Sequence, residues 1–172
     1  MKAFTMIELL VVVALIMILS AVGLGAYTIS TTKSYDAQRK NDLNQISKAL
    51  ESFNTDIGHY PLSGTSGEIL CYDREGDTAS DITCPGPSLT IRIDGVINSY
   101  MTIPADPDSS NSYIYDSDGS SYALYTYLHN AEDRDLIKDE NGQALSDPYG
   151  VSCGADKCNY KITEFGLSKT NE

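Results

Sequence analysis

The sequence predicts an α+β fold in which one long N-terminal helix, transmembrane in its first half, packs on a small antiparallel β-sheet. Three observations lead to this prediction. The 21 residues from Leu9 to Ile29 carry no charge, and the residues after them repeat apolar side chains at helical spacing. From Leu62 onward the chain is rich in Gly, Ser, Asp, Asn and Tyr and contains short alternating stretches typical of strands.

Length and charge limit the classes of protein that the chain can belong to. It has 172 residues and a formal net charge of -12, with 12 basic and 24 acidic residues. The length fits one compact domain with an appendage. A nucleic-acid-binding surface is not expected, because neutralising phosphates requires clustered Lys and Arg side chains. The excess of acidic residues favours solubility of the polar part.

The apolar run begins close to the start of the sequence. As a helix with a rise of about 1.5 Å per residue, 21 residues span about 30 Å, the thickness of a bilayer core. Only Met1, Lys2 and Ala3 precede the wider apolar region that begins at Phe4, and no Ala-x-Ala site follows the run, so it is predicted to be retained in the mature protein. The basic residues after the run favour the opposite orientation from the cysteines, so these two signals leave its topology open.

The residues after the apolar run predict an amphipathic continuation of the same helix. One face carries Leu43, Ile46, Leu50, Phe53 and Ile57, at spacings of 3, 4, 3 and 4. The opposite face is predicted to carry Arg39, Lys40, Gln45, Lys48 and Glu51. Because Gly58 can cap a helix and Pro61 cannot continue one, a single helix is predicted from about Phe4 to Ile57.

The remaining residues predict short strands joined by loops. The stretch "LTIRIDGVI" alternates around Asp-Gly and predicts a strand or a hairpin. "SYIYDSDGSSYALYTYL" is the clearest hairpin in the chain. "NYKITEFG" predicts a last short strand. Four stretches dense in turn residues predict loops: "GTSGE", "DREGDT", "CPGPS" and "DPDSSNS". Alternating tyrosines in such strands most often pack within the sheet.

The four cysteines predict two disulfides in an oxidising compartment. They are Cys71, Cys84, Cys153 and Cys158, and no two of them form the Cys-x2-Cys pair of a structural zinc site. Three pairings are possible. The sequential one, Cys71 with Cys84 and Cys153 with Cys158, is favoured because short loops close at the lowest entropic cost.

The N-terminal stretch "KAFTMIELLVVVALIMILSAVGLGAY" resembles the N-terminus of type IV pilins and of the pseudopilins of type II secretion systems. That family combines a short basic leader, a small residue at the cleavage junction, a Phe-Thr-x-Ile-Glu-Leu motif and a long apolar helix. The resemblance implies that prepilin peptidase cleaves after Ala3 and methylates the new amine of Phe4. Ala3 departs from the Gly that the family usually has at this position.

The resemblance also implies an organisation and a function. It divides the chain into a leader (1–3), a transmembrane and filament-core half of the helix (4–30), an amphipathic half (31–60) and a globular head (61–172). It implies a structural subunit of a type IV pilus that starts as a single-pass inner-membrane precursor and ends in an extracellular filament. The implied partners are other copies of the chain, prepilin peptidase, the assembly platform and minor pilins. Two alternatives stay open: a pseudopilin of a secretion or DNA-uptake system, and a membrane-anchored binding domain.

Glu8 is the residue to which the resemblance gives the sharpest role. A charged side chain inside a membrane helix is costly, so it tends to be paired or functional. Cleavage before Phe4 creates an amine four residues from this carboxylate. The implied role is a pair between the Phe4 amine and Glu8, in the same subunit or a neighbour, that admits a subunit to the filament.

No motif in the sequence indicates an enzyme or a cofactor. His59 and His129 are the two histidines, and neither lies in a nucleophile or metal motif. Some relatives of the resembled family hold calcium near a Tyr-rich hairpin, where this chain has Asp106, Asp108, Asp116 and Asp118. The spacing is not that of an EF-hand, so solvated turn carboxylates are favoured over a calcium site.

Overall fold

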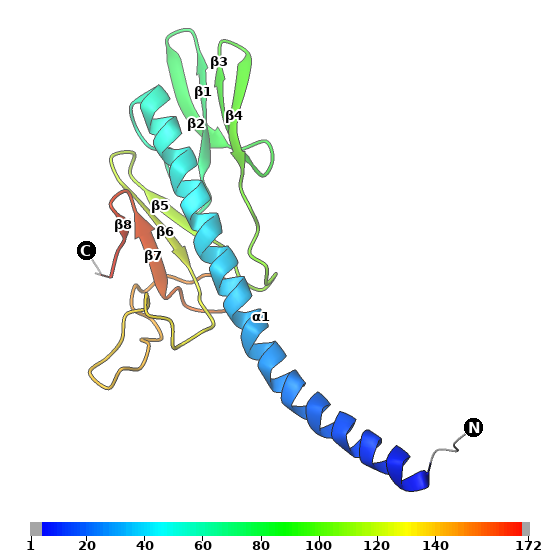
Figure 1. The fold of residues 1–172 in the computed structure, drawn as a ribbon. Coiled ribbons are helices and arrows are strands. Elements are labelled where there is room, and N and C mark those ends of the chain that lie inside the picture. Colours follow the sequence, from blue (N-terminus) through cyan, green and yellow to red (C-terminus); the bar gives the residue numbers. More distant parts are fainter. Residues whose placement is uncertain (1–4, 170–172) are drawn as a thin grey trace.

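The computed structural model describes residues 5–169, leaving aside the side chains of residues 22–26. The elements are one helix, α1 (Met6–Ile57), and eight strands: β1 (Leu70–Glu75), β2 (Thr78–Thr83), β3 (Ser88–Ile93), β4 (Val96–Thr102), β5 (Ile114–Ser117), β6 (Tyr122–Thr126), β7 (Tyr160–Thr163) and β8 (Gly166–Leu167). The second half of α1 lies along two sheets, and its first half projects away from them (Figure 1).

The apolar stripe of α1 lies where its periodicity predicts. Leu43, Ile46, Leu50 and Phe53 have exposed fractions of 0–1% and form a core with strand residues such as Leu89 and Leu124. The helix ends as predicted, because Gly58 takes the left-handed conformation (φ 91°) and its N–H donates to the carbonyl of Asn54.

The predicted polar face of α1 is wrong at one residue. Arg39 has an exposed fraction of only 1%, and Asp36 and Asp42 are buried beside it. The physical reason is the helical period: Arg39 precedes Ile46 by seven residues, or about two turns, so both side chains lie on the same face. Burial is possible because each of these charged groups has a partner of opposite charge or a hydrogen-bond donor.

The first sheet has the strand order β2-β1-β3-β4. The stretch "LTIRIDGVI", predicted as a strand or a hairpin, is the hairpin of β3 and β4, with Asp94 and Gly95 at the turn. The prediction of a loop at "DREGDT" is wrong, because these residues end β1, make its turn and begin β2. β2 alternates too weakly to be found by pattern, since it is largely exposed and is held by backbone pairing with β1 at six positions.

The second sheet has the order β5-β6-β7-β8 and is antiparallel throughout. The Tyr-rich hairpin is confirmed as β5 and β6, and "NYKITEFG" supplies β7 and its turn. Tyr122, Leu124 and Thr126 alternate into the core along β6. The Tyr-rich run therefore contributes to packing in the sheet, as predicted.

The predicted fold class needs two corrections. The head has two four-stranded sheets where one small antiparallel sheet was predicted, and β1 pairs with β3 in parallel. Among the described residues, no helix has both the length and the apolarity needed to cross a membrane. That finding overturns the transmembrane assignment of residues 4–30 and, with it, the predicted localisation as a single-pass inner-membrane precursor.

Candidate functional site

Between Met6 and Leu19, the projecting half of α1 presents an apolar surface that no other described part of the chain covers. The large apolar side chains between Met6 and Leu19 have exposed fractions from 42% at Val13 to 87% at Met6. No sheet residue lies beside this half in Figure 1. Exposed apolar surfaces of this extent mark sites of association with another molecule, because their contact with water is unfavourable.

The helix begins at a capping box that involves Glu8. Thr5 is the N-cap residue: its hydroxyl accepts from the Glu8 N–H (3.3 Å), and the Glu8 carboxylate accepts from the Thr5 N–H (3.0 Å) and the Thr5 hydroxyl (2.8 Å). These two hydrogen bonds from Thr5 lower the pKa of Glu8. Glu8 is therefore ionised at neutral pH and fixes the first turn of the helix.

This capping role was missed in the sequence, although its signal is present there. Thr5-Met6-Ile7-Glu8 is a Thr-x-x-Glu pattern directly before an apolar run, the signature of a capping box. Ala3 and Phe4, the predicted cleavage and methylation residues, lie outside the described residues. The predicted pair between the Phe4 amine and Glu8 therefore stays a prediction.

A buried cluster of charges holds α1 at the point where it leaves the head. The Arg39 guanidinium donates two hydrogen bonds to the Asp106 carboxylate (2.9 and 2.8 Å) and one to Asp36 (2.9 Å). It also donates to Nδ1 of His129 (3.0 Å). Burial lowers the pKa of Arg39, but the hydrogen bonds and charges of Asp106 and Asp36 outweigh it, and the pKa is raised overall.

A second, more exposed cluster lies one residue further along α1. The Lys40 ammonium donates to Asp133 (2.7 Å) and Asp135 (2.6 Å) and lies 5.4 Å from the centre of the Tyr160 ring. Burial raises the pKa of Asp133, but the Lys40 hydrogen bond, the Asp135 N–H and the Lys40 charge together outweigh burial, so the pKa is lowered overall. The two clusters tie the loops after β4 and β6 to the same two turns of the helix.

Tyrosine hydroxyls make a third set of contacts with α1. Four of them donate to helix carboxylates: Tyr113 to Asp42 (2.8 Å), Tyr122 and Tyr60 to Glu51 (3.3 and 3.1 Å), and Tyr100 to Asp56 (2.7 Å). Burial raises the pKa of Tyr122 to about 12, so this phenol stays a donor throughout the physiological range. These contacts show how the head can bury tyrosines without leaving their hydroxyls unpaired.

The two disulfides have the predicted sequential pairing. Cys71 bonds to Cys84, and Cys153 bonds to Cys158. The first joins the start of β1 to the residue that follows β2. The second closes a five-residue separation in the segment before β7. Both agree with an oxidising compartment.

The four carboxylates considered for calcium do not form one site. Asp108 and Asp118 accept hydrogen bonds from Ser110 and Ser120 within their own turns, which fits the favoured interpretation of turn carboxylates. Asp106 differs, because it is buried against Arg39. Within residues 5–169, no group of three or more His, Cys, Asp and Glu side chains could hold a metal ion.

The two histidines make separate contacts, His59 with the next residue and His129 with the distant Arg39. Nδ1 of His59 lies 2.8 Å from the carbonyl oxygen of Tyr60, and His129 accepts from Arg39 as described above. Both therefore take part in contacts that position a loop.

Comparison of the chain with protein-family models, curated proteins and solved structures gives no significant match.

Proposed function

We propose that this chain is the structural subunit of a filament of the type IV pilin kind, which self-associates through the projecting half of α1. One observation carries the proposal: the large apolar side chains from Met6 to Leu19 are 42–87% exposed on the half of α1 that projects from the head. A second copy offers a matching surface, because every copy presents the same apolar rod. Parallel packing of such rods buries them and leaves the acidic heads outside.

The N-terminal motif supports the same proposal. Its partners would be prepilin peptidase, which would cut after Ala3 and methylate Phe4, and then an assembly platform and minor pilins. Mass spectrometry of the mature chain checks the first step: a methylated Phe4 is expected, and an intact Met1 would contradict it. The length of the assembled filaments distinguishes a pilus subunit from a pseudopilin.

Substitutions of Glu8 test how this residue acts in assembly. Glu8→Gln keeps a side chain that can complete the capping box but removes the charge that would pair with the Phe4 amine. Glu8→Ala removes both. If the charge pair admits subunits to the filament, both variants are expressed normally and both lose filaments in electron microscopy.

A different outcome would separate the two roles of Glu8. Normal filament abundance from Glu8→Gln, with loss only in Glu8→Ala, would assign the effect to the cap and reject the charge pair. Thr5→Ala serves as the matched control, because it removes the N-cap side chain and leaves the Glu8 charge in place. It is expected to assemble.

A further inference from the structure

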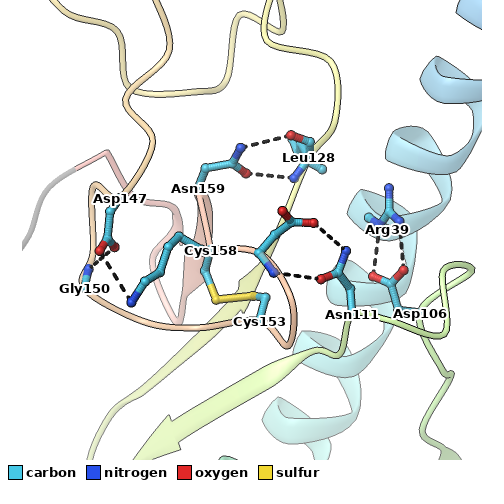
Figure 2. The surroundings of a disulfide bond; sticks show 11 residues. Arg39, Asp106, Asn111, Leu128, Asp147, Gly150, Cys153, Cys158 and Asn159 are labelled. Carbon is cyan, nitrogen blue, oxygen red and sulfur yellow. Dashed lines mark hydrogen bonds and ion pairs between the residues drawn. A yellow bond between two sulfur atoms is a disulfide. The ribbon is translucent and has the colours of Figure 1, made fainter.

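The loop closed by Cys153 and Cys158 contacts two segments that are far from it in sequence (Figure 2). Both cysteines are fully buried. One contacted segment precedes β5 and the other follows β6. The first segment is preceded by Asp106, which accepts hydrogen bonds from Arg39 of α1, and the second donates hydrogen bonds to Asp36 of α1. The disulfide loop is therefore connected to the helix through these two segments.

The first connection runs through Asn111. Its side-chain amide donates to the Asp156 carboxylate (3.2 Å) and accepts from the Asp156 N–H (3.3 Å). Backbone hydrogen bonds on either side, from Ser112 to the Cys153 carbonyl (2.9 Å) and from Ala155 to the Ser110 carbonyl (3.0 Å), fix the same segment. This segment leads back to Asp106, the buried partner of Arg39.

The second connection runs through Asn159, the residue after Cys158. Its side chain accepts from the Leu128 N–H (2.7 Å) and donates to the Leu128 carbonyl (2.9 Å). The next two backbone N–H groups, of His129 and Asn130, donate to the Asp36 carboxylate (3.0 and 2.7 Å). The disulfide loop thus holds in place the segment whose backbone N–H groups donate to the buried Asp36 carboxylate.

We propose that the Cys153–Cys158 loop is a two-armed brace that positions Asp106 on Arg39 and the His129 and Asn130 amides on Asp36. Both arms end on the turn of α1 next to its projecting half, so the brace fixes where the helix leaves the head. The disulfide keeps the loop in the one shape that lets Asn111 and Asn159 reach their partners together. This property belongs to the folded monomer and does not depend on filament formation.

Gly154 gives an independent reason to assign this shape to the loop. It has φ +101°, and a Cβ at this position would lie 2.4 Å from the carbonyl oxygen of Ser110. The backbone of the loop therefore approaches the first arm more closely than any side chain allows. Gly150, nearby in the chain, has φ +72° but open space around it, so it offers a matched glycine for comparison.

Amide hydrogen exchange by NMR on the full chain tests the brace. The Asp108 N–H donates to the Asp106 carboxylate (2.8 Å), so it reports on the first arm. In Cys153→Ser/Cys158→Ser, the His129, Asn130 and Asp108 amides are expected to exchange roughly tenfold faster or more, while the amide of Leu50 in the core of α1 is much less affected. The matched control is Cys71→Ser/Cys84→Ser, which removes the other disulfide and leaves these three rates unchanged relative to Leu50.

Two outcomes would overturn the proposal: unchanged exchange at His129, Asn130 and Asp108, or a rise that is equal at these amides and at Leu50. Should the disulfide variant fail to fold, Asn111→Ala and Gly154→Ala can be used, because they keep both disulfides. Their exchange rates at the same three amides are again compared with the rate at Leu50. For these variants, Gly150→Ala is the control. A selective rise in Gly154→Ala that is absent in Gly150→Ala supports the brace.

Discussion

At the scale of single residues, α1 is held to the head by charges as well as by apolar contacts. Arg39 is buried with two carboxylates and a histidine around it. A buried ion pair contributes little compared with an apolar pair of the same size, but removing one partner leaves the other charge buried and unpaired. Any docking of the helix that separates Arg39 from these carboxylates is therefore disfavoured.

Removal of the Arg39 side chain is expected to be one of the most destabilising single changes in the head. Arg39→Ala leaves the Asp36 and Asp106 carboxylates buried without their cation, and the expected loss in the free energy of unfolding is about 3–5 kcal/mol. Urea denaturation measures it. Lys48→Ala, an exposed position on the same helix, is the control and should change the free energy by no more than about 0.5 kcal/mol. Equal effects of the two substitutions would contradict the role of the cluster.

The Lys40 cluster predicts how stability depends on pH. The pKa of Asp133 is lowered in the folded state from 3.8, its ordinary value, so the pair contributes its full stability above that pH. The contribution is lost as the pH falls below 3.8 and through the lowered pKa. Urea midpoints measured between neutral and acidic pH should therefore fall less steeply in Lys40→Met than in the unmodified chain. An identical acid slope in both would show that the pair contributes nothing measurable.

At the scale of elements, the two halves of α1 differ in how their apolar side chains are covered. In its second half an apolar stripe is covered by the sheets, while from Met6 to Leu19 similar side chains are exposed on all sides of the helix. The same residue type should therefore have a different value for stability in each half.

Leucine truncations in the two halves measure this difference. Leu50 is fully buried, so Leu50→Ala is expected to lower the free energy of unfolding by about 2–5 kcal/mol. Leu19 is 72% exposed, so Leu19→Ala should change it by less than about 0.5 kcal/mol in the monomer. A large loss for Leu19→Ala in the monomer would mean that the projecting half has a partner within the chain.

At the scale of the whole molecule, the features that depend on neighbouring residues could be predicted from the sequence. The stripe from Leu43 to Phe53, the Gly58 cap and the hairpin at Asp94 and Gly95 follow from periodicity and turn chemistry. The disulfide pairing followed from loop length. The burial of Arg39 could not be found in this way, because Asp106 and His129 lie 67 and 90 residues away along the chain.

The polar strands β1 and β2 were missed for a related reason. Their stability comes from pairing with each other, from the parallel pairing of β1 with β3 and from the Cys71–Cys84 bond, and none of these leaves an alternating apolar pattern in β2. The capping box at Thr5 and Glu8 is different, because its pattern was in the sequence. Thr5 and Glu8 are three residues apart, so their contact follows from the local sequence alone.

The central claim is that the projecting half of α1 is the surface through which copies of the chain associate. Electron microscopy of the mature chain and of two matched aspartate variants tests it most directly. Ile16→Asp places a charge on the projecting half, and Val96→Asp places one on the head at a similar exposure, 57% against 61%. The unmodified chain and Val96→Asp are expected to form filaments, and Ile16→Asp is expected to remain monomeric. Filaments of normal abundance from Ile16→Asp would contradict the claim.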